Sequence, residues 1–140
     1  MAVQVSFYSD AADPLHYACR LVRRALASGK PVGVCVPQDQ ATRLDELLWS
    51  FDALEFIPHR RWNGETPPAP GEVLLVDDAA RLPHRGLLLN LGEALPADAF
   101  AFERVLEVVG REPALVQAGR QRYRAYQQAG VALDHFSAAG

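Results

Sequence analysis

The chain has 140 residues, 49% of them apolar and 22% charged, which suits one soluble domain with one hydrophobic core. The formal net charge of −3 excludes a general nucleic-acid coat, so any anion binding must be local. The sequence has no run of about 18 apolar residues, which excludes a transmembrane helix, and it does not begin with a signal-peptide pattern. We therefore expect a cytoplasmic protein without a membrane partner.

The first quarter of the chain predicts a strand, a helix and a second strand. Residues 3–9 are rich in β-forming side chains and favour a strand. Asp13 and Pro14 predict a helix start, because a capping carboxylate stands before a proline at the first helical position. Gly29 is expected to end this helix. Residues 31–36 are continuously apolar, as in a strand buried on both faces of a parallel sheet.

The middle of the chain continues with a helix, a loop and another strand. A helix is expected over residues 38–50, with Trp49 outside its apolar face. Residues 54–57 favour a short strand or edge segment that is stopped by the proline after it. Residues 64–71 are rich in proline and predict a stiff surface loop. Residues 72–76, in which four apolar residues follow Glu72, predict another buried strand.

The last third predicts strands at residues 86–91 and 104–109, with a short helical piece over 97–102 between them. A long helix is expected over residues 112–129. Residues 131–140 are small and polar, and we expect them to form a loosely held tail.

Alternating helices and apolar strands favour one α/β domain over residues 1–140, with three layers and a mostly parallel central sheet covered by helices on both faces. This Rossmann-like arrangement is expected to lack a nucleotide site, because no G-x-G-x-x-G is present. Gly29 and Lys30 do not form a phosphate-binding loop, because Pro31 stands where such a loop needs Ser or Thr.

Neither a metal nor a cofactor is expected. Cys19 and Cys35 lie in apolar surroundings and are interpreted as buried free thiols, and the two cysteines and four histidines show no zinc spacing. Asp77 and Asp78 follow an apolar strand and are interpreted as a turn. The alternative, a small metal-dependent α/β hydrolase, would rest on these two carboxylates.

The last helix has one side that is short of acids. At about 100° per residue, its packing face holds Leu115, Ala118, Tyr126 and Ala129. A second, basic and aromatic face holds Val116, Arg120, Tyr123, Arg124 and Gln127. Arg122 projects toward the packing face, so its head must reach solvent or find a buried acid. A solvated helix usually mixes charge signs, so the missing acids favour a binding surface.

Several short segments together carry a family resemblance. They are Phe7-Tyr8, Ser28-Gly29-Lys30, Arg43-Leu44-Asp45-Glu46 with Leu48-Trp49, Phe56-Ile57-Pro58-His59, and Arg120-Gln121-Arg122-Tyr123-Arg124-Ala125-Tyr126 followed by Ala129-Gly130. In order and spacing they resemble the chi subunit of bacterial DNA polymerase III holoenzyme, an accessory protein of the clamp loader. The resemblance covers nearly the whole chain, and the combination is specific although no single motif is.

The resemblance implies a non-catalytic adaptor in DNA replication, without a cofactor. Chi proteins pair with a small partner, psi, which ties them to the clamp loader. They also bind the C-terminal tail of single-stranded DNA-binding protein, which is acidic and ends in a phenylalanine carboxylate. The residues that the resemblance assigns to this tail site are Val109, Val116, Arg120, Tyr123 and Arg124.

The residue types suit such a ligand on physical grounds. Arg120 can hold the terminal carboxylate in a bidentate contact, and Tyr123 and Val109 can wall a pocket for the aromatic ring. Arg124 can attract the acidic residues upstream. Where some relatives carry a lysine, this chain has Val116, and Arg111 or Arg122 is a candidate to compensate.

The resemblance also implies a second surface. Trp49, Phe56, Ile57 and Pro58 match the region that contacts psi, and an alternative helicase partner of some chi proteins uses the same region. The plainer interpretation is that Phe56 lies in the core and Trp49 covers a loop. In the adaptor hypothesis, nucleic acid is contacted only indirectly. The alternative is a direct single-stranded nucleic-acid-binding module, in which cations and aromatics over residues 59–62 and on the last helix contact bases.

Overall fold

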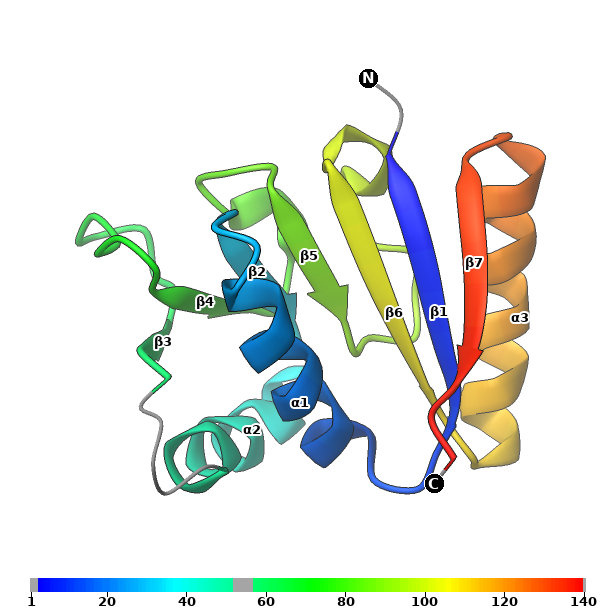
Figure 1. Ribbon diagram of the computed structural model, residues 1–140, viewed down its shortest axis with the longest axis horizontal. Coiled ribbons are helices and arrows are strands. Elements are labelled where there is room, and N and C mark those ends of the chain that lie inside the picture. The colour runs from blue at the N-terminus through cyan, green and yellow to red at the C-terminus, as the bar shows by residue number, and fades with distance from the viewer. Residues whose placement is uncertain (1–2, 52–56, 140) are drawn as a thin grey trace.

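Seven strands form the centre of the computed structural model, which describes residues 3–51 and 57–139 (Figure 1). They are β1 (Gln4–Ala11), β2 (Val32–Cys35), β3 (His59–Arg61), β4 (Val73–Val76), β5 (Leu87–Asn90), β6 (Arg104–Gly110) and β7 (Ala132–Ser137). Their order across the sheet is β3-β4-β2-β5-β6-β1-β7, and each described pair of neighbours is parallel. The predicted α/β class with a mostly parallel sheet is confirmed.

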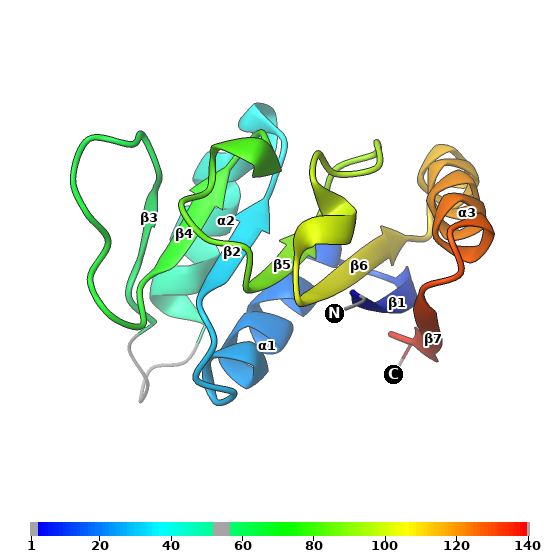
Figure 2. The same cartoon turned by 90° about the horizontal axis from the view of Figure 1, so that it is seen from above.

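Helices cover both faces of this sheet (Figure 2). The long helices are α1 (Pro14–Leu26), α2 (Gln38–Ser50) and α3 (Pro113–Gln128), and the short 3₁₀ helices are η1 (Ala79–Arg81) and η2 (Ala99–Ala101). The buried side chains of α1 and α2 belong to one apolar cluster, whereas Tyr126 of α3 belongs to a second cluster, which also includes Ala79 and Ala99. The expected three layers are therefore present.

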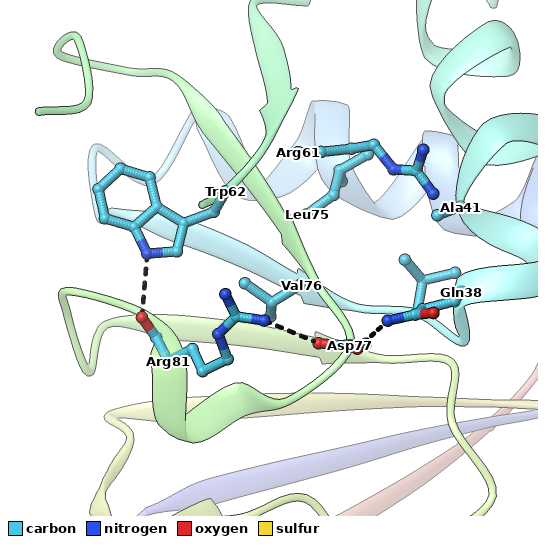
Figure 3. Close-up of a pocket in the computed structure, with 9 residues that line it drawn as sticks. Gln38, Ala41, Arg61, Trp62, Leu75, Val76, Asp77 and Arg81 are labelled. Carbon is cyan, nitrogen blue, oxygen red and sulfur yellow. Dashed lines mark hydrogen bonds and ion pairs between the residues drawn. The ribbon is translucent and has the colours of Figure 1, made fainter. Parts of the chain in front are cut away.

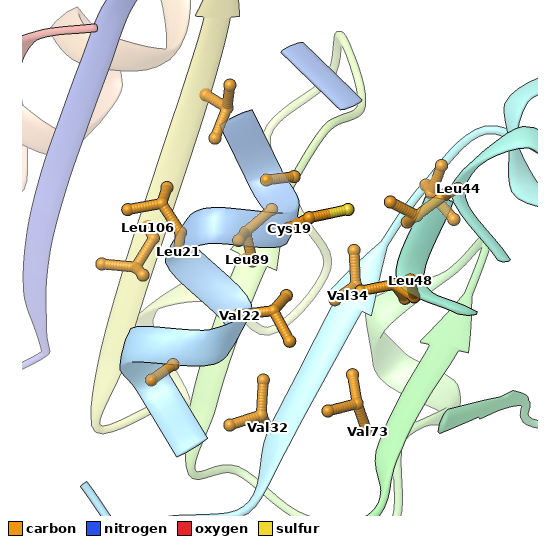
Figure 4. Packing of buried hydrophobic residues seen from close by; sticks show 14 of the residues in the cluster. Cys19, Leu21, Val22, Val32, Val34, Leu44, Leu48, Val73, Leu89 and Leu106 are labelled. Atoms are coloured by element: carbon orange, nitrogen blue, oxygen red, sulfur yellow. The ribbon is translucent and has the colours of Figure 1, made fainter. Parts of the chain in front are cut away.

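The first cluster lies between the α1–α2 layer and the sheet (Figure 4). Leu21 and Val22 come from α1, Leu44 and Leu48 from α2, and Val34 from β2, and all five are buried. Burying side chains of this kind contributes about 1.5–3 kcal/mol each relative to leaving them exposed. This face of the sheet is thus filled by core packing.

The start of α1 follows from its capping residues. Asp13 has extended backbone, and its Oδ1 accepts a hydrogen bond of 3.2 Å from the backbone N–H of His16. Pro14 takes the first helical position. After the helix, Gly29 has a φ of +78°, a conformation that glycine adopts without a Cβ clash. These are the roles that the sequence predicts for Asp13, Pro14 and Gly29.

The two edges of the sheet differ from the sequence prediction. The expected strand or edge segment at 54–57 falls mostly outside the described residues, and the edge strand β3 begins only at His59. The expected loose tail at 131–140 instead contains β7, which pairs with β1 from Gln4↔Ala132 to Ser9↔Ser137. Most β7 side chains are exposed, so the strand is held mainly by backbone pairing with β1. For the same reason, its sequence has no continuous apolar run.

The proline-rich loop over residues 64–71 is exposed and is tied to β3 by one arginine. A terminal nitrogen of Arg60 donates to the carbonyls of Thr66 and Pro67 at 2.6 and 2.9 Å, and its Nε lies 3.1 Å from a Glu72 carboxylate oxygen.

Cys19 and Cys35 are buried free thiols, as predicted. In the described part of the chain, none of the helices has the length and apolar character needed to cross a membrane.

Candidate functional site

A pocket of about 330 Å³ lies between α3 and the strands β6, β1 and β7. Helix α3 contributes Val116, Gly119, Arg120 and Tyr123, and the strands contribute Phe7, Ser9, Val109 and His135. Four of the five residues assigned to tail binding from the sequence, Val109, Val116, Arg120 and Tyr123, therefore line one pocket. Arg124 is exposed on the same helix and is not part of the lining.

A glycine lets α3 lie close to the sheet at this pocket. A Cβ on Gly119 would lie 2.9 Å from Cγ2 and 3.0 Å from Cγ1 of Val109. The pocket floor is aromatic, because the ring of Phe7 meets the ring of Tyr123 edge-on at a centroid distance of 5.1 Å. Neither Gly119 nor Phe7 was predicted from the sequence to belong to this site. A glycine in the middle of a helix costs about 0.5–1 kcal/mol relative to Ala, and that anomaly is a signal of close approach.

The rim of the pocket is polar and positively charged. Arg120 and Arg124 are exposed, and neither forms a hydrogen bond or an ion pair with another described residue. Across the pocket, Oγ of Ser9 lies 2.6 Å from Nε2 of His135, and the ring of His135 lies 6.4 Å from that of Tyr123. Neither Ser9 nor His135 was predicted at this site, and His135 belongs to a strand that was expected to be a loose tail.

The other side of α3 holds a buried ion pair. Nε of Arg122, which is 4% exposed, donates to Oε1 of Glu107 at 2.9 Å, and the Glu107 side chain is fully buried. Tyr126 donates its hydroxyl to Oε2 of Glu107 at 2.8 Å, and Nδ2 of Asn90 donates to Oε1 at 2.9 Å. Of the two outcomes expected for Arg122, solvent or a buried acid, the structure shows the buried acid. Arg122 therefore cannot replace the missing lysine in the pocket.

Burial dominates the electrostatics of this cluster. Burial raises the pKa of the Glu107 carboxyl, while the Arg122 guanidinium and the hydrogen bonds from Asn90 and Tyr126 act in the opposite direction. Burial, followed by the neighbouring Glu107 charge, also raises the pKa of the Tyr126 hydroxyl. The second candidate to compensate for the lysine, Arg111, lies in an exposed ion pair of 2.8 Å with Asp10.

The predicted packing face of α3 is right in part. Tyr126 is fully buried, and Leu115 and Ala118 are half-buried. Ala129 is exposed, so its assignment to the packing face is wrong. The helix ends at Gln128, and Ala129 is only its C-terminal cap, so the helical spacing no longer fixes its direction.

The predicted psi-binding surface is divided in the structure. Trp49 is 54% exposed, and its ring lies 4.5 Å from the ring of His59. Pro58 is half-buried, whereas Ile57 is 2% exposed and belongs to the core. Phe56 lies outside the described residues. The ring of His59 is fixed by the Ile57 carbonyl at 2.7 Å and the Asp45 carboxylate at 3.0 Å.

A pocket of about 180 Å³ lies at the carboxyl end of β4, the position where open α/β sheets commonly bind ligands (Figure 3). Its acid, Asp77, accepts hydrogen bonds from Gln38 at 2.6 Å and Arg81 at 3.4 Å. Asp78 accepts from the N–H of Ala80 at 3.0 Å and caps η1. Within residues 3–51 and 57–139, no three His, Cys, Asp or Glu side chains are grouped as metal ligands. Both carboxylates therefore accept hydrogen bonds from neighbouring protein groups, as in a structural turn.

Residues 59–62 do not present one continuous basic and aromatic surface. His59 is buried, and the guanidinium of Arg60 is held by Glu72 and the proline-rich loop. The indole N–H of Trp62 donates to the carbonyl of Arg81 at 3.0 Å, as Figure 3 shows. Arg61 is the exposed cation of this segment. Because of these contacts, residues 59–62 have little free aromatic surface on which a base could stack.

Comparison with known proteins places these features in a family. A family model described as "DNA polymerase III chi subunit, HolC" matches residues 2–134. A Pseudomonas aeruginosa protein named DNA polymerase III subunit chi is 39% identical over 138 residues, which cover 94% of this chain and 95% of that protein. Proteins of the same name from Escherichia coli and Haemophilus influenzae are 36% and 34% identical, and cover 83% and 76% of this chain and 80% and 75% of their own lengths.

Proposed function

The chain belongs to the DNA polymerase III chi subunit family, and we propose that it acts as a non-catalytic adaptor in DNA replication. In this proposal, the pocket beside α3 binds the acidic C-terminal tail of single-stranded DNA-binding protein. A second surface around Trp49 binds a psi-like subunit of the clamp loader. The observation that supports tail binding best is the convergence of Val109, Val116, Arg120 and Tyr123 on one pocket.

The chemistry of the pocket matches a peptide that ends in a phenylalanine carboxylate. Phe7, Val109 and Tyr123 give an apolar wall against which an aromatic ring can pack edge-on or offset. Arg120 lies in the lining with its guanidinium free of described partners, so it can donate two hydrogen bonds to a carboxylate. Arg124, one turn further along α3, extends the positive charge toward the acidic residues upstream of the terminus.

A peptide titration tests the tail site. An acidic peptide that ends in Asp-Ile-Pro-Phe is expected to bind with micromolar affinity at low salt, and more weakly as salt screens the arginines. Arg124→Ala should weaken binding less than Arg120→Ala, because Arg124 lies outside the pocket lining. The absence of any binding at low salt would show that the tail assignment is wrong.

The second surface rests on Trp49, because large exposed aromatics are favoured anchors of protein interfaces. The half-buried Pro58 immediately precedes β3, whose first residue, His59, has its ring 4.5 Å from that of Trp49, while Ile57 packs in the core beneath. A helicase partner would use this same surface. Trp49→Ala should weaken capture of a psi-like subunit and leave peptide binding unchanged, as measured by co-purification and by titration of the same protein preparation. Loss of both activities would mean that the two surfaces are not separate.

A further inference from the structure

The two edges of the sheet are protected to different degrees. At one edge, β3 has only three residues, two of which are arginines, and it leads toward the proline-rich loop. Short length, charge and proline are the usual means by which proteins prevent an edge strand from pairing with another chain. At the other edge, β7 has six residues and contains neither proline nor lysine (Figure 1). No strand of the described chain pairs with its outer side.

The hydrogen-bond pattern shows which backbone groups of β7 point outward. The N–H of Ala138 donates to the carbonyl of Ser9 in β1 at 2.7 Å. Backbone groups alternate along a strand, so Phe136 and Asp134 also direct their N–H and C=O groups toward β1. The N–H and C=O groups of Leu133, His135 and Ser137 therefore point to the open edge.

His135 connects this open edge to the pocket. Its side chain lines the pocket opposite Tyr123 and Arg120, while its backbone groups face outward from the sheet. Helix α3 and strand β7 are two walls of the same pocket, so a chain that leaves the pocket between them passes beside the edge of β7. The pocket therefore borders the open edge at His135.

The charges around β7 favour an acidic chain on the side that faces α3. Arg120 and Arg124 project from α3, and neither has a described partner. The acid of β7, Asp134, alternates to the opposite face of the sheet, where the ring of Phe136 stacks on Tyr8 at 5.4 Å. An acidic strand added to this edge would thus face cations on one side and meet Asp134 only on the other.

From this adjacency we infer that the acidic peptide bound in the pocket pairs with β7 as an eighth strand of the sheet. The inference rests on the proposed function, since it takes the same peptide as ligand. The terminal ring and carboxylate occupy the pocket, and the residues upstream exchange backbone hydrogen bonds with Leu133, His135 and Ser137. Strand addition of this kind binds the ligand mainly through its main chain, with side-chain pockets adding specificity.

N-methylation of the peptide backbone tests this arrangement without changing the protein. The probe is the octapeptide Ala-Asp-Ala-Asp-Asp-Ile-Pro-Phe with a free carboxyl terminus, compared with four versions that are N-methylated at one of residues two to five. An added strand directs only alternate amides toward β7. Methylation is therefore expected to weaken binding by about three- to tenfold at alternate positions, the value of one net backbone hydrogen bond, and by less than about twofold at the positions between them.

The tetrapeptide Asp-Ile-Pro-Phe separates this inference from the proposed function. If the octapeptide binds more tightly than the tetrapeptide and methylation alternates in effect, strand addition is supported. If both peptides bind equally and methylation has no alternating effect, strand addition is overturned while the pocket assignment stands. If neither peptide binds at low salt, the proposed function itself fails.

Amide hydrogen exchange provides an independent measurement on the protein. The octapeptide should slow exchange at Leu133, His135 and Ser137, whose N–H groups point outward. The amides of Asp134 and Phe136 already face β1 and should change little. Protection that appears without peptide and grows with protein concentration would mean that β7 pairs with a second copy of the chain, which would contradict the inference.

Discussion

Arg120 and Arg122 lie on the same turn of α3, and replacing each by methionine is expected to change a different property of the protein. Arg122 is 4% exposed and bonded to the fully buried Glu107, whereas Arg120 is exposed and lines the pocket. Methionine keeps most of the apolar stem of arginine and removes its charge. Arg122→Met should therefore lower the free energy of unfolding, and Arg120→Met should lower peptide affinity.

The magnitude for Arg122→Met follows from the contacts that remain. Removing one partner of a buried ion pair typically costs about 3–5 kcal/mol. Glu107 keeps its hydrogen bonds from Asn90 and Tyr126, and its carboxyl can take up a proton, so we expect the lower end of this range, about 3 kcal/mol at pH 7. For a domain of this size, such a loss lowers the melting temperature by roughly 10 °C. Arg120→Met should change stability by less than about 0.5 kcal/mol.

Urea denaturation at two pH values measures this effect. Burial already raises the pKa of Glu107, and loss of Arg122 removes the nearest charge that opposes the shift. A carboxyl whose pKa is higher in the folded state binds more protons there than in the unfolded chain, so the stability it confers is present at low pH and is lost as the pH rises. The deficit of Arg122→Met relative to the unmodified protein should therefore be smaller at pH 4 than at pH 7.

Three outcomes would contradict these expectations for Arg122 and Arg120. A loss below about 1 kcal/mol at pH 7 would mean that the Arg122–Glu107 pair is not the buried contact described here. A deficit that is the same at both pH values would mean that Glu107 does not titrate as its burial requires. An equal loss of stability for Arg120→Met would contradict the division of α3 into a buried face and a pocket face.

Three further predictions concern packing, thiols and capping. Gly119→Ala should destabilise the protein by about 1–3 kcal/mol in thermal unfolding, because the new Cβ would press on Val109. Alanine favours helices, so an increase in stability would show that α3 is free to move away from Val109. Burial raises the pKa of both Cys19 and Cys35 to about 11. Neither thiol should therefore react with a disulfide reagent at pH 8 until the chain is unfolded, and fast labelling of the folded protein would contradict their burial. Asp13→Ala should cost about 1 kcal/mol by removing the cap of α1, and an unchanged urea midpoint would show that the cap contributes nothing.

The helical spacing of α3 placed Val116, Arg120, Tyr123 and Arg124 on one face, and the family resemblance assigned that face to tail binding. It separated Arg120 and Tyr123 from Arg122, and it left two outcomes for Arg122, contact with solvent or with a buried acid. Glu107 could have been suspected, since it is the acid within the apolar strand over residues 104–110. Its pairing with Arg122 still depended on how α3 lies over the sheet, which no local pattern determines.

The strand walls of the pocket could be predicted less well than the helix. Polar edge strands such as β7 are held by backbone pairing, and that pairing leaves no hydrophobic period in the sequence. His135 was therefore missed, together with the role of Ser9 opposite it. Ile57 was assigned to an interface from its family position, and in this chain its side chain packs in the core.

A double comparison of peptide and protein shows whether Arg120 holds a terminal carboxylate in the pocket beside α3. The acidic octapeptide is titrated as the free acid and as the C-terminal amide, against the unmodified protein and against Arg120→Met. Amidation is expected to weaken binding to the unmodified protein by at least about tenfold, the value of a charge-assisted contact, and to have almost no further effect on Arg120→Met. Equal binding of the acid and the amide to the unmodified protein would contradict this expectation, and so would the same amidation penalty in both proteins.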